Sequence, residues 1–108
     1  MNYYQQLKVS PDASAHQIKE AYRRLAFEYH PDRNTNDPQA VEKMKVINEA
    51  YAVLSSPDKR RQYDGLYQRY GDDAGRQFRE SYSEHDIFKG SDIQSIFEEM
   101  ARSFGLRG

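Results

Sequence analysis

Two long apolar stripes, separated by a short polar segment, constrain the fold of this 108-residue chain more than any other feature. Apolar side chains recur at helical spacing over residues 15–29 and again over residues 39–55. Pro31 and Pro38 bracket the polar segment, and a proline disfavours helical geometry in the residue before it. Two such helices can bury their stripes against each other, so the sequence predicts an antiparallel hairpin with an exposed loop at its tip.

Local signals mark where the helices begin. Ser14 and Gln17 fit a capping box, in which each side chain satisfies a backbone group of the first turn. Ser56 and Pro57 introduce a further, basic helix, which we expect to end near residues 64–65. A turn or two within the first nine residues would close the core. The predicted fold class is therefore all-α.

The composition changes beyond residue 70. This segment holds five of the six glycines and four of the five phenylalanines, and its eight acidic residues outnumber its five basic ones. We therefore expect a helical domain over residues 1–66, followed over residues 67–108 by a glycine- and phenylalanine-containing linker or tail. Within the tail, apolar spacing predicts an amphipathic helix near residues 92–104, with Ser91 or Asp92 as its cap.

Charge and cysteine content exclude several classes of protein. The formal net charge of −1 gives no global basic field of the kind that drives nucleic-acid binding. The absence of cysteine removes disulfide scaffolds and thiolate sites, and is compatible with a reducing cytosol. No apolar run approaches the roughly 20 residues of a membrane span, and the first residues lack a signal-peptide pattern. We expect a cytoplasmic protein that binds neither membrane nor nucleic acid.

The tripeptide His30-Pro31-Asp32 is the candidate functional motif. A catalytic role is unsupported, because no nucleophile motif or glycine-rich phosphate loop accompanies it, and the three histidines lack metal-ligand spacing. We therefore expect no enzyme activity, cofactor or metal. Proline would hold the imidazole and the carboxylate rigidly in solvent, which suits protein recognition. The alternative is structural: Pro31 ends the helix, His30 caps it and Asp32 makes a local turn bond.

Several ordered motifs place the tripeptide in a wider pattern. They are a double tyrosine at residues 3–4, IKEAYRRLA at 18–26, YHPDRN at 29–34, INEAY at 47–51 and DKRRQYD at 58–64. Together, over about residues 2–65, they resemble the J-domain (DnaJ-type) co-chaperone family. The resemblance implies four helices, with the second and third forming the hairpin and the tripeptide lying in the loop between them.

The resemblance also implies a partner and a mechanism. In this family the basic face of the second helix docks on a seventy-kilodalton heat-shock chaperone (DnaK-type), and the loop aspartate promotes ATP hydrolysis by that chaperone in protein folding and stress response. Client polypeptides would be bound through other regions. Carried over by position, the partner-binding candidates are Lys19, Tyr22, Arg23, Arg24, His30, Pro31, Asp32, Arg33, Asn34, Met44 and Lys45.

Some of these candidates have structural alternatives. Arg24 could form an ordinary surface ion pair with Glu20 or Glu28, and Tyr22 lies on the apolar stripe and could be a core residue. Two departures from the family pattern are Lys8, where a glycine is usual, and Glu28, where a basic residue is common. Lys8 puts in doubt the geometry of the first turn, and Glu28 puts in doubt the strength of docking on the chaperone.

The tail suggests a regulatory hypothesis. The acidic, amphipathic stretch from Asp92 to Phe104 could fold back onto the basic second helix and compete with the chaperone. Alternatively, it packs as added core, mediates dimerisation or is disordered. Two rival functions are a small helical nucleic-acid binder and a J-like module that recruits a partner without activating it.

Overall fold

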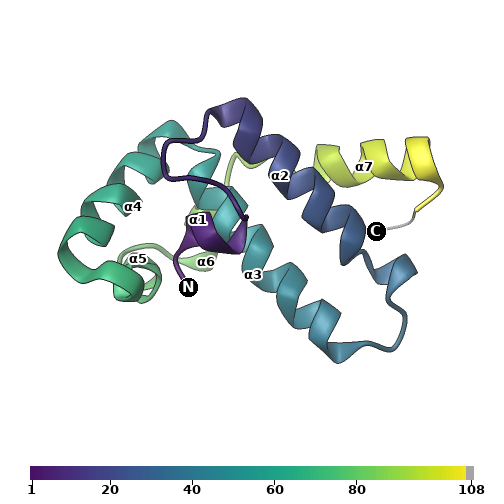
Figure 1. The fold of residues 1–108 in the computed structure, drawn as a ribbon, viewed down its shortest axis with the longest axis horizontal. Helices are drawn as coiled ribbons and strands as arrows, with labels where there is room; N and C mark the ends of the chain where they lie inside the picture. Colours follow the sequence, from purple (N-terminus) through teal and green to yellow (C-terminus); the bar gives the residue numbers. More distant parts are fainter. Residues whose placement is uncertain (107–108) are drawn as a thin grey trace.

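The computed structural model describes residues 1–106, and within this range the chain folds into helices without strands (Figure 1). In chain order the elements are α1 (Tyr3–Gln6), α2 (Ala15–Glu28), the 3₁₀ turn η1 (Pro31–Arg33), α3 (Pro38–Leu54), α4 (Pro57–Tyr70), the 3₁₀ turn η2 (Gly71–Asp73), α5 (Ala74–Ser81), α6 (Glu84–Phe88) and α7 (Ile93–Phe104). In the described part of the chain, no helix combines the length and the apolar character needed to cross a bilayer. The predicted all-α class is confirmed.

Helices α2 and α3 form the predicted antiparallel hairpin, with the η1 loop at its tip (Figure 1). The capping box at Ser14 and Gln17 starts α2 as expected, with hydrogen bonds of 2.8 and 3.1 Å. The two apolar stripes meet in the core, where the rings of Tyr22 and Tyr51 stack at 4.2 Å between centroids. Both rings are fully buried, so this stack fixes how the two helices face each other.

Helices α1 and α4 both pack against α3 and complete the core of the predicted domain. The ring of Tyr3 on α1 stacks on Tyr63 of α4 at 4.4 Å, and its backbone N–H donates to the Tyr63 hydroxyl at 3.0 Å. Arg60 donates to the backbone carbonyls of Pro11 and Ala13, which ties the loop before α2 to α4. These contacts join α1, α3 and α4 into one core.

Helix α4 is longer than the sequence predicts. The expected end near residues 64–65 was wrong, because α4 continues through Gly65 to Tyr70. Leu66 and Tyr67 pack against the core and continue the apolar stripe that Tyr63 begins, which outweighs the low helix propensity of one glycine. The helix ends where Gly71 adopts a positive φ of 59°. The division of the chain into residues 1–66 and 67–108 remains a prediction.

Part of the tail packs on this helical body. Ala74 and Phe78 of α5 and Ile87 of α6 are buried and belong to the same core cluster. The ammonium of Lys59 on α4 donates to the carbonyls of Ile87 and Lys89, at 3.0 and 3.1 Å. Helix α6 packs against α3. Lys59 on α4 also holds the end of α6 through these two hydrogen bonds.

The replacement of the family's usual glycine by Lys8 has a structural consequence. Lys8 follows the last residues of α1 and adopts a left-handed conformation with φ of 58°, which disfavours side chains that carry a Cβ. We predict that Lys8→Gly increases the free energy of unfolding by about 0.5–1 kcal/mol, after the entropy of the glycine is deducted. Urea denaturation followed by circular dichroism measures this difference.

Asn36 supplies the matched control for this prediction. It is exposed and has a φ of 64°, but asparagine tolerates left-handed geometry better than lysine does. Asn36→Gly should therefore stabilise the protein less than Lys8→Gly. Equal effects of the two substitutions would contradict the strain assigned to Lys8.

Candidate functional site

Local hydrogen bonds hold the loop at the tip of the hairpin. The backbone N–H of Asp32 donates to Nδ1 of His30 at 3.0 Å, which closes the turn around Pro31. The side-chain amide of Asn34 donates to the carbonyls of Glu28 and His30, each at 2.9 Å. The Glu28 carbonyl lies at the end of α2, where a helix leaves acceptors unpaired, whereas the His30 carbonyl precedes η1 and also accepts from the Arg33 N–H at 3.0 Å. Asn34 therefore links the end of the helix to the loop.

Arg33 fixes the other side of the loop against α2. Its guanidinium lies 4.2 Å from the ring centroid of Phe27 and donates to the Phe27 carbonyl at 3.2 Å. Pro31, Asp32 and Arg33 are all exposed. The loop therefore presents the Asp32 side chain on a turn that backbone and side-chain contacts hold in place.

The histidine of the tripeptide differs from the prediction. We expected its imidazole in solvent, but His30 is 0% exposed. Helix α7 lies along α2 (Figure 1), and its Phe97 ring packs 5.6 Å from the imidazole, between centroids. The Nδ1 atom is occupied by the Asp32 N–H, whereas Nε2 has no hydrogen-bond partner within residues 1–106. The prediction was wrong because it treated the loop without the tail.

The basic face of α2 is paired with acidic residues at and near α7. Lys19 forms an ion pair of 3.1 Å with Asp92, and Arg23 forms one with Glu99. Further along α2, the ring of Phe27 lies 4.9 Å from that of Phe104. The pairs run in the same order along both helices, so α7 follows the direction of α2 and covers much of its candidate face.

Other candidates on the hairpin divide between surface and core. Arg24 is exposed and has no ion pair within the described residues, while Glu20 pairs instead with Arg23 at 3.5 Å. Tyr22 is fully buried and donates to Oδ1 of Asn48 at 2.6 Å, as its alternative as a core residue predicts. Met44 is likewise buried.

Lys45 lies on the exposed side of α3, where it pairs with Glu42 at 3.4 Å. The candidates on the basic face of α2 and on the η1 loop form one surface that runs from Lys19 to the tip of the hairpin, and α7 covers part of it, including His30. We call this the contact surface. It comprises Lys19, Arg23, Arg24, His30, Pro31, Asp32, Arg33 and Asn34.

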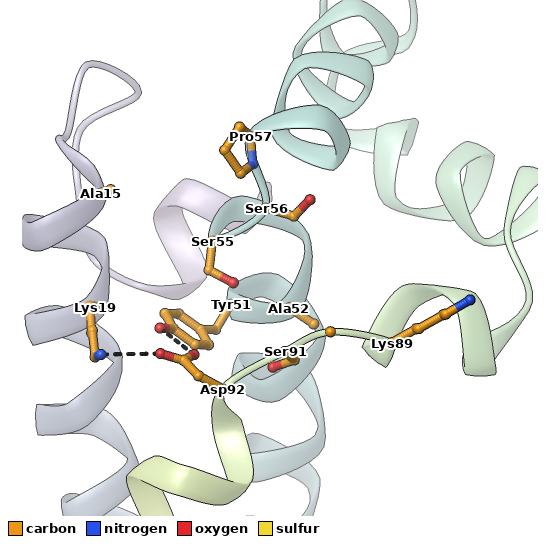
Figure 2. Close-up of a pocket in the computed structure, with 11 residues that line it drawn as sticks. Ala15, Lys19, Tyr51, Ala52, Ser55, Ser56, Pro57, Lys89, Ser91 and Asp92 are labelled. Atoms are coloured by element: carbon orange, nitrogen blue, oxygen red, sulfur yellow. Dashed lines mark hydrogen bonds and ion pairs between the residues drawn. The ribbon is translucent and has the colours of Figure 1, made fainter.

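The sequence did not single out the residue that connects α7 to the hairpin. Asp92 was expected as a possible helix cap and as the first residue of the acidic stretch that could meet the second helix, without a stated partner. Ser91 accepts the hydrogen bond from the Ile93 N–H, and Asp92 makes no cap bond. Its carboxylate instead accepts from the Tyr51 hydroxyl at 2.8 Å and pairs with Lys19. Figure 2 shows the three side chains meeting beside a cavity of about 500 Å³.

The charge state of Asp92 follows from these contacts. Partial burial disfavours the ionised carboxylate, but the Tyr51 hydroxyl and the Lys19 ammonium together hold the pKa of Asp92 below its usual value. Burial also raises the pKa of the Tyr51 hydroxyl, as does its bond to Asp92. Near neutral pH, Tyr51 is therefore the proton donor and Asp92 the charged acceptor.

Comparison with known proteins assigns this arrangement to a class. Residues 2–64 match the family model described as "DnaJ domain". This range includes the whole hairpin and its loop. A helical module built on this hairpin and tripeptide is a J-domain. The chain belongs to the DnaJ domain family.

Individual relatives support the assignment. The chaperone protein DnaJ of Methanosarcina thermophila is 47% identical over 104 residues, which are 96% of this chain and 25% of the relative. That of Helicobacter pylori (strain ATCC 700392 / 26695) is 45% identical over 109 residues, covering 100% of this chain and 28% of the relative. The chain thus spans about a quarter of the length of these curated relatives. A solved J-Trx1 fragment of ERdj5 aligns with a TM-score of 0.59 and 40% identity, over 69% of this chain and 37% of that one.

The depressed pKa of Asp92 gives a testable pH dependence. Since the folded-state pKa lies below the ordinary value of 3.8, the contribution of the ionised carboxylate to the folded state is fully present above that pH. It is lost as the pH falls through the folded-state pKa. We predict that the ¹³C shift of the Asp92 carboxyl titrates with a midpoint below 3.8, and that Tyr51→Phe moves the midpoint upward. A midpoint at or above 3.8 in the unsubstituted protein would contradict this.

Proposed function

We propose that this protein is a co-chaperone that binds a seventy-kilodalton heat-shock chaperone of the DnaK type and stimulates its ATP hydrolysis through the His30-Pro31-Asp32 loop. The observation that carries the proposal is the intact tripeptide on a rigid turn at the tip of a J-domain hairpin. The DnaJ domain family is not itself an enzyme, so hydrolysis would occur in the partner. The proposed site of action is the cytoplasm.

The roles of individual residues follow from their positions. Asp32 lies exposed on the turn and would engage a cationic group of the chaperone. Lys19, Arg23 and Arg24 would attract its acidic surface and orient the encounter. Tyr22 and Met44 would act mainly through the core, since both are buried.

We further propose that α7 holds the protein in an autoinhibited state. Its acidic residues pair with Lys19 and Arg23, and its Phe97 covers His30, so these three residues cannot contact a partner at the same time. The closed arrangement competes with the chaperone for the contact surface. Opening of α7 would then precede full stimulation.

The balance of interactions favours a closed state that can open. Ile96 and Met100 of α7 are buried, and full burial of such side chains contributes about 1.5–3 kcal/mol each. Against this, closing leaves Nε2 of His30 buried without a partner, which costs about 1–3 kcal/mol. The ion pairs of Lys19 and Arg23 are partly exposed and add little. Docking of α7 is thus stabilised mainly by apolar contacts and weakened by the unpaired imidazole nitrogen.

Substitution of Asp32 tests the role of the loop. In single-turnover ATP hydrolysis by a purified DnaK-type chaperone, the wild-type chain should accelerate hydrolysis, and Asp32→Asn should reduce the rate to near the basal value. The substitution removes the carboxylate charge and keeps the backbone N–H that bonds to His30. Circular dichroism checks that the variant is folded. Equal stimulation by both chains would remove Asp32 from the mechanism.

Substitution of Glu99 tests autoinhibition by α7. Glu99→Lys places a cation beside Arg23, replacing attraction by repulsion, and should raise the stimulation seen at subsaturating concentration by roughly two- to fivefold. Glu98→Lys is the matched control, because Glu98 is exposed on the same helix and has no ion pair within residues 1–106. Both variants change the net charge equally. Autoinhibition is contradicted by unchanged stimulation in Glu99→Lys, or by the same increase in both variants.

A further inference from the structure

We propose that Lys19 and Tyr51 form a carboxylate-binding site that holds Asp92 when α7 is closed and takes an aspartate or glutamate side chain of the partner chaperone when α7 opens. The inference rests on the proposed function, since it names the chemistry by which the partner would replace the tail. It adds Tyr51, a residue of α3 outside the predicted partner-binding set.

The geometry of the site is that of a carboxylate receptor. The Tyr51 hydroxyl donates to Oδ1 of Asp92 at 2.8 Å, and the Lys19 ammonium lies 3.1 Å from Oδ2. The two donors come from different helices and engage different oxygens of one carboxylate (Figure 2). The Tyr51 ring is buried and stacked on Tyr22, so its hydroxyl position is set by the core of the hairpin, independently of the tail.

The surroundings leave room for an exchange of carboxylates. A cavity of about 500 Å³ lies beside the site, between the start of α2, the end of α3 and the segment that leads into α7 (Figure 2). Its lining includes Lys19, which favours an anionic occupant, and Ser55. Lys89 and Ser56 also line it, but their polar ends point away from Asp92 (Figure 2). Once Asp92 leaves, the Lys19 ammonium and the Tyr51 hydroxyl remain, and an acidic side chain complements them.

The segment before Asp92 combines an anchored end of α6 with an unobstructed glycine, Gly90. Lys59 holds the carbonyls of Ile87 and Lys89, so α6 stays anchored up to that point. Gly90 follows, with a φ of 80° and nothing within 4 Å of the position that a Cβ would take. The backbone of α6 approaches α3 closely, whereas α7 is attached mainly through side chains. Rotation at Gly90 would therefore free Asp92 and α7 together while α5 and α6 remain docked.

The experiment distinguishes the two occupants of the site within the 108-residue chain. Asp92→Ala vacates the site, so a further Tyr51→Phe substitution in this background reports only on the partner. We expect Asp92→Ala to bind the chaperone more tightly than the wild type does. We expect Asp92→Ala/Tyr51→Phe to bind roughly three- to tenfold more weakly than Asp92→Ala, because one hydrogen bond to a charged group is lost. Affinity is measured by fluorescence anisotropy in the presence of ATP.

Tyr22→Phe in the same Asp92→Ala background is the matched control. It removes the hydroxyl of the stacked partner ring, which donates to Asn48 instead of Asp92, so it tests whether any lost tyrosine hydroxyl weakens binding through the core. We expect it to reduce the affinity less than Tyr51→Phe does. Equal affinities of Asp92→Ala and Asp92→Ala/Tyr51→Phe, or equal losses from the two tyrosine variants, would overturn the proposed site.

A measurement without the chaperone separates this inference from the proposed function. In hydrogen exchange of the free protein, Asp92→Ala and Tyr51→Phe should each accelerate exchange of the α7 amides while those of α6 keep their protection. No acceleration in either variant would overturn the role of Asp92 in holding α7. If exchange changes as expected but no DnaK-type chaperone binds the wild type or any variant, the proposed function fails, and with it the partner's use of the site.

Discussion

The stack of Tyr22 on Tyr51 is the contact on which the rest of the structure depends. It joins the two long helices at their crossing, and it buries two large side chains whose hydroxyls each need a partner. The Tyr22 hydroxyl donates to Asn48 within the hairpin, whereas the Tyr51 hydroxyl donates to Asp92 just before α7. The same pair of rings therefore packs the domain and sets the point at which the tail is attached. Burial also raises the pKa of both hydroxyls, which keeps them as hydrogen-bond donors.

The parts of the fold that local sequence determines could be predicted. Helices α2 and α3 follow from apolar periodicity, and the start of α2 follows from a capping box whose two residues are three positions apart. Helix α7 lies where its apolar spacing predicts a helix. The end of α4 could not be found in this way, because Gly65 reads as a stop. Only the packing of Leu66 and Tyr67 on a core made by distant residues carries the helix past it.

In the candidate site, too, local motifs were predictable from the sequence and long-range contacts were not. The family motifs located the loop and the basic face of α2, and opposite charge suggested that the tail would meet that face. Neither could identify which atoms pair, because Lys19 and Asp92 are separated by most of the chain and Tyr51 reads as an ordinary core aromatic. The buried imidazole of His30 is the clearest case. Its exposure depends on Phe97, and nothing in the tripeptide or its neighbours carries that information.

Hydrogen bonds within the hairpin shape the loop. His30, Asp32 and Asn34 are linked to one another and to the end of α2, and Arg33 packs on Phe27, so these contacts lie within the hairpin. Helix α7 adds aromatic contacts to His30 and Phe27, and Glu99 of α7 and Asp92 just before it form ion pairs with two cations of α2. Its departure would therefore uncover a loop that already has its shape. Under the proposed function, α7 controls access to the contact surface, while these hairpin contacts shape the turn that carries Asp32.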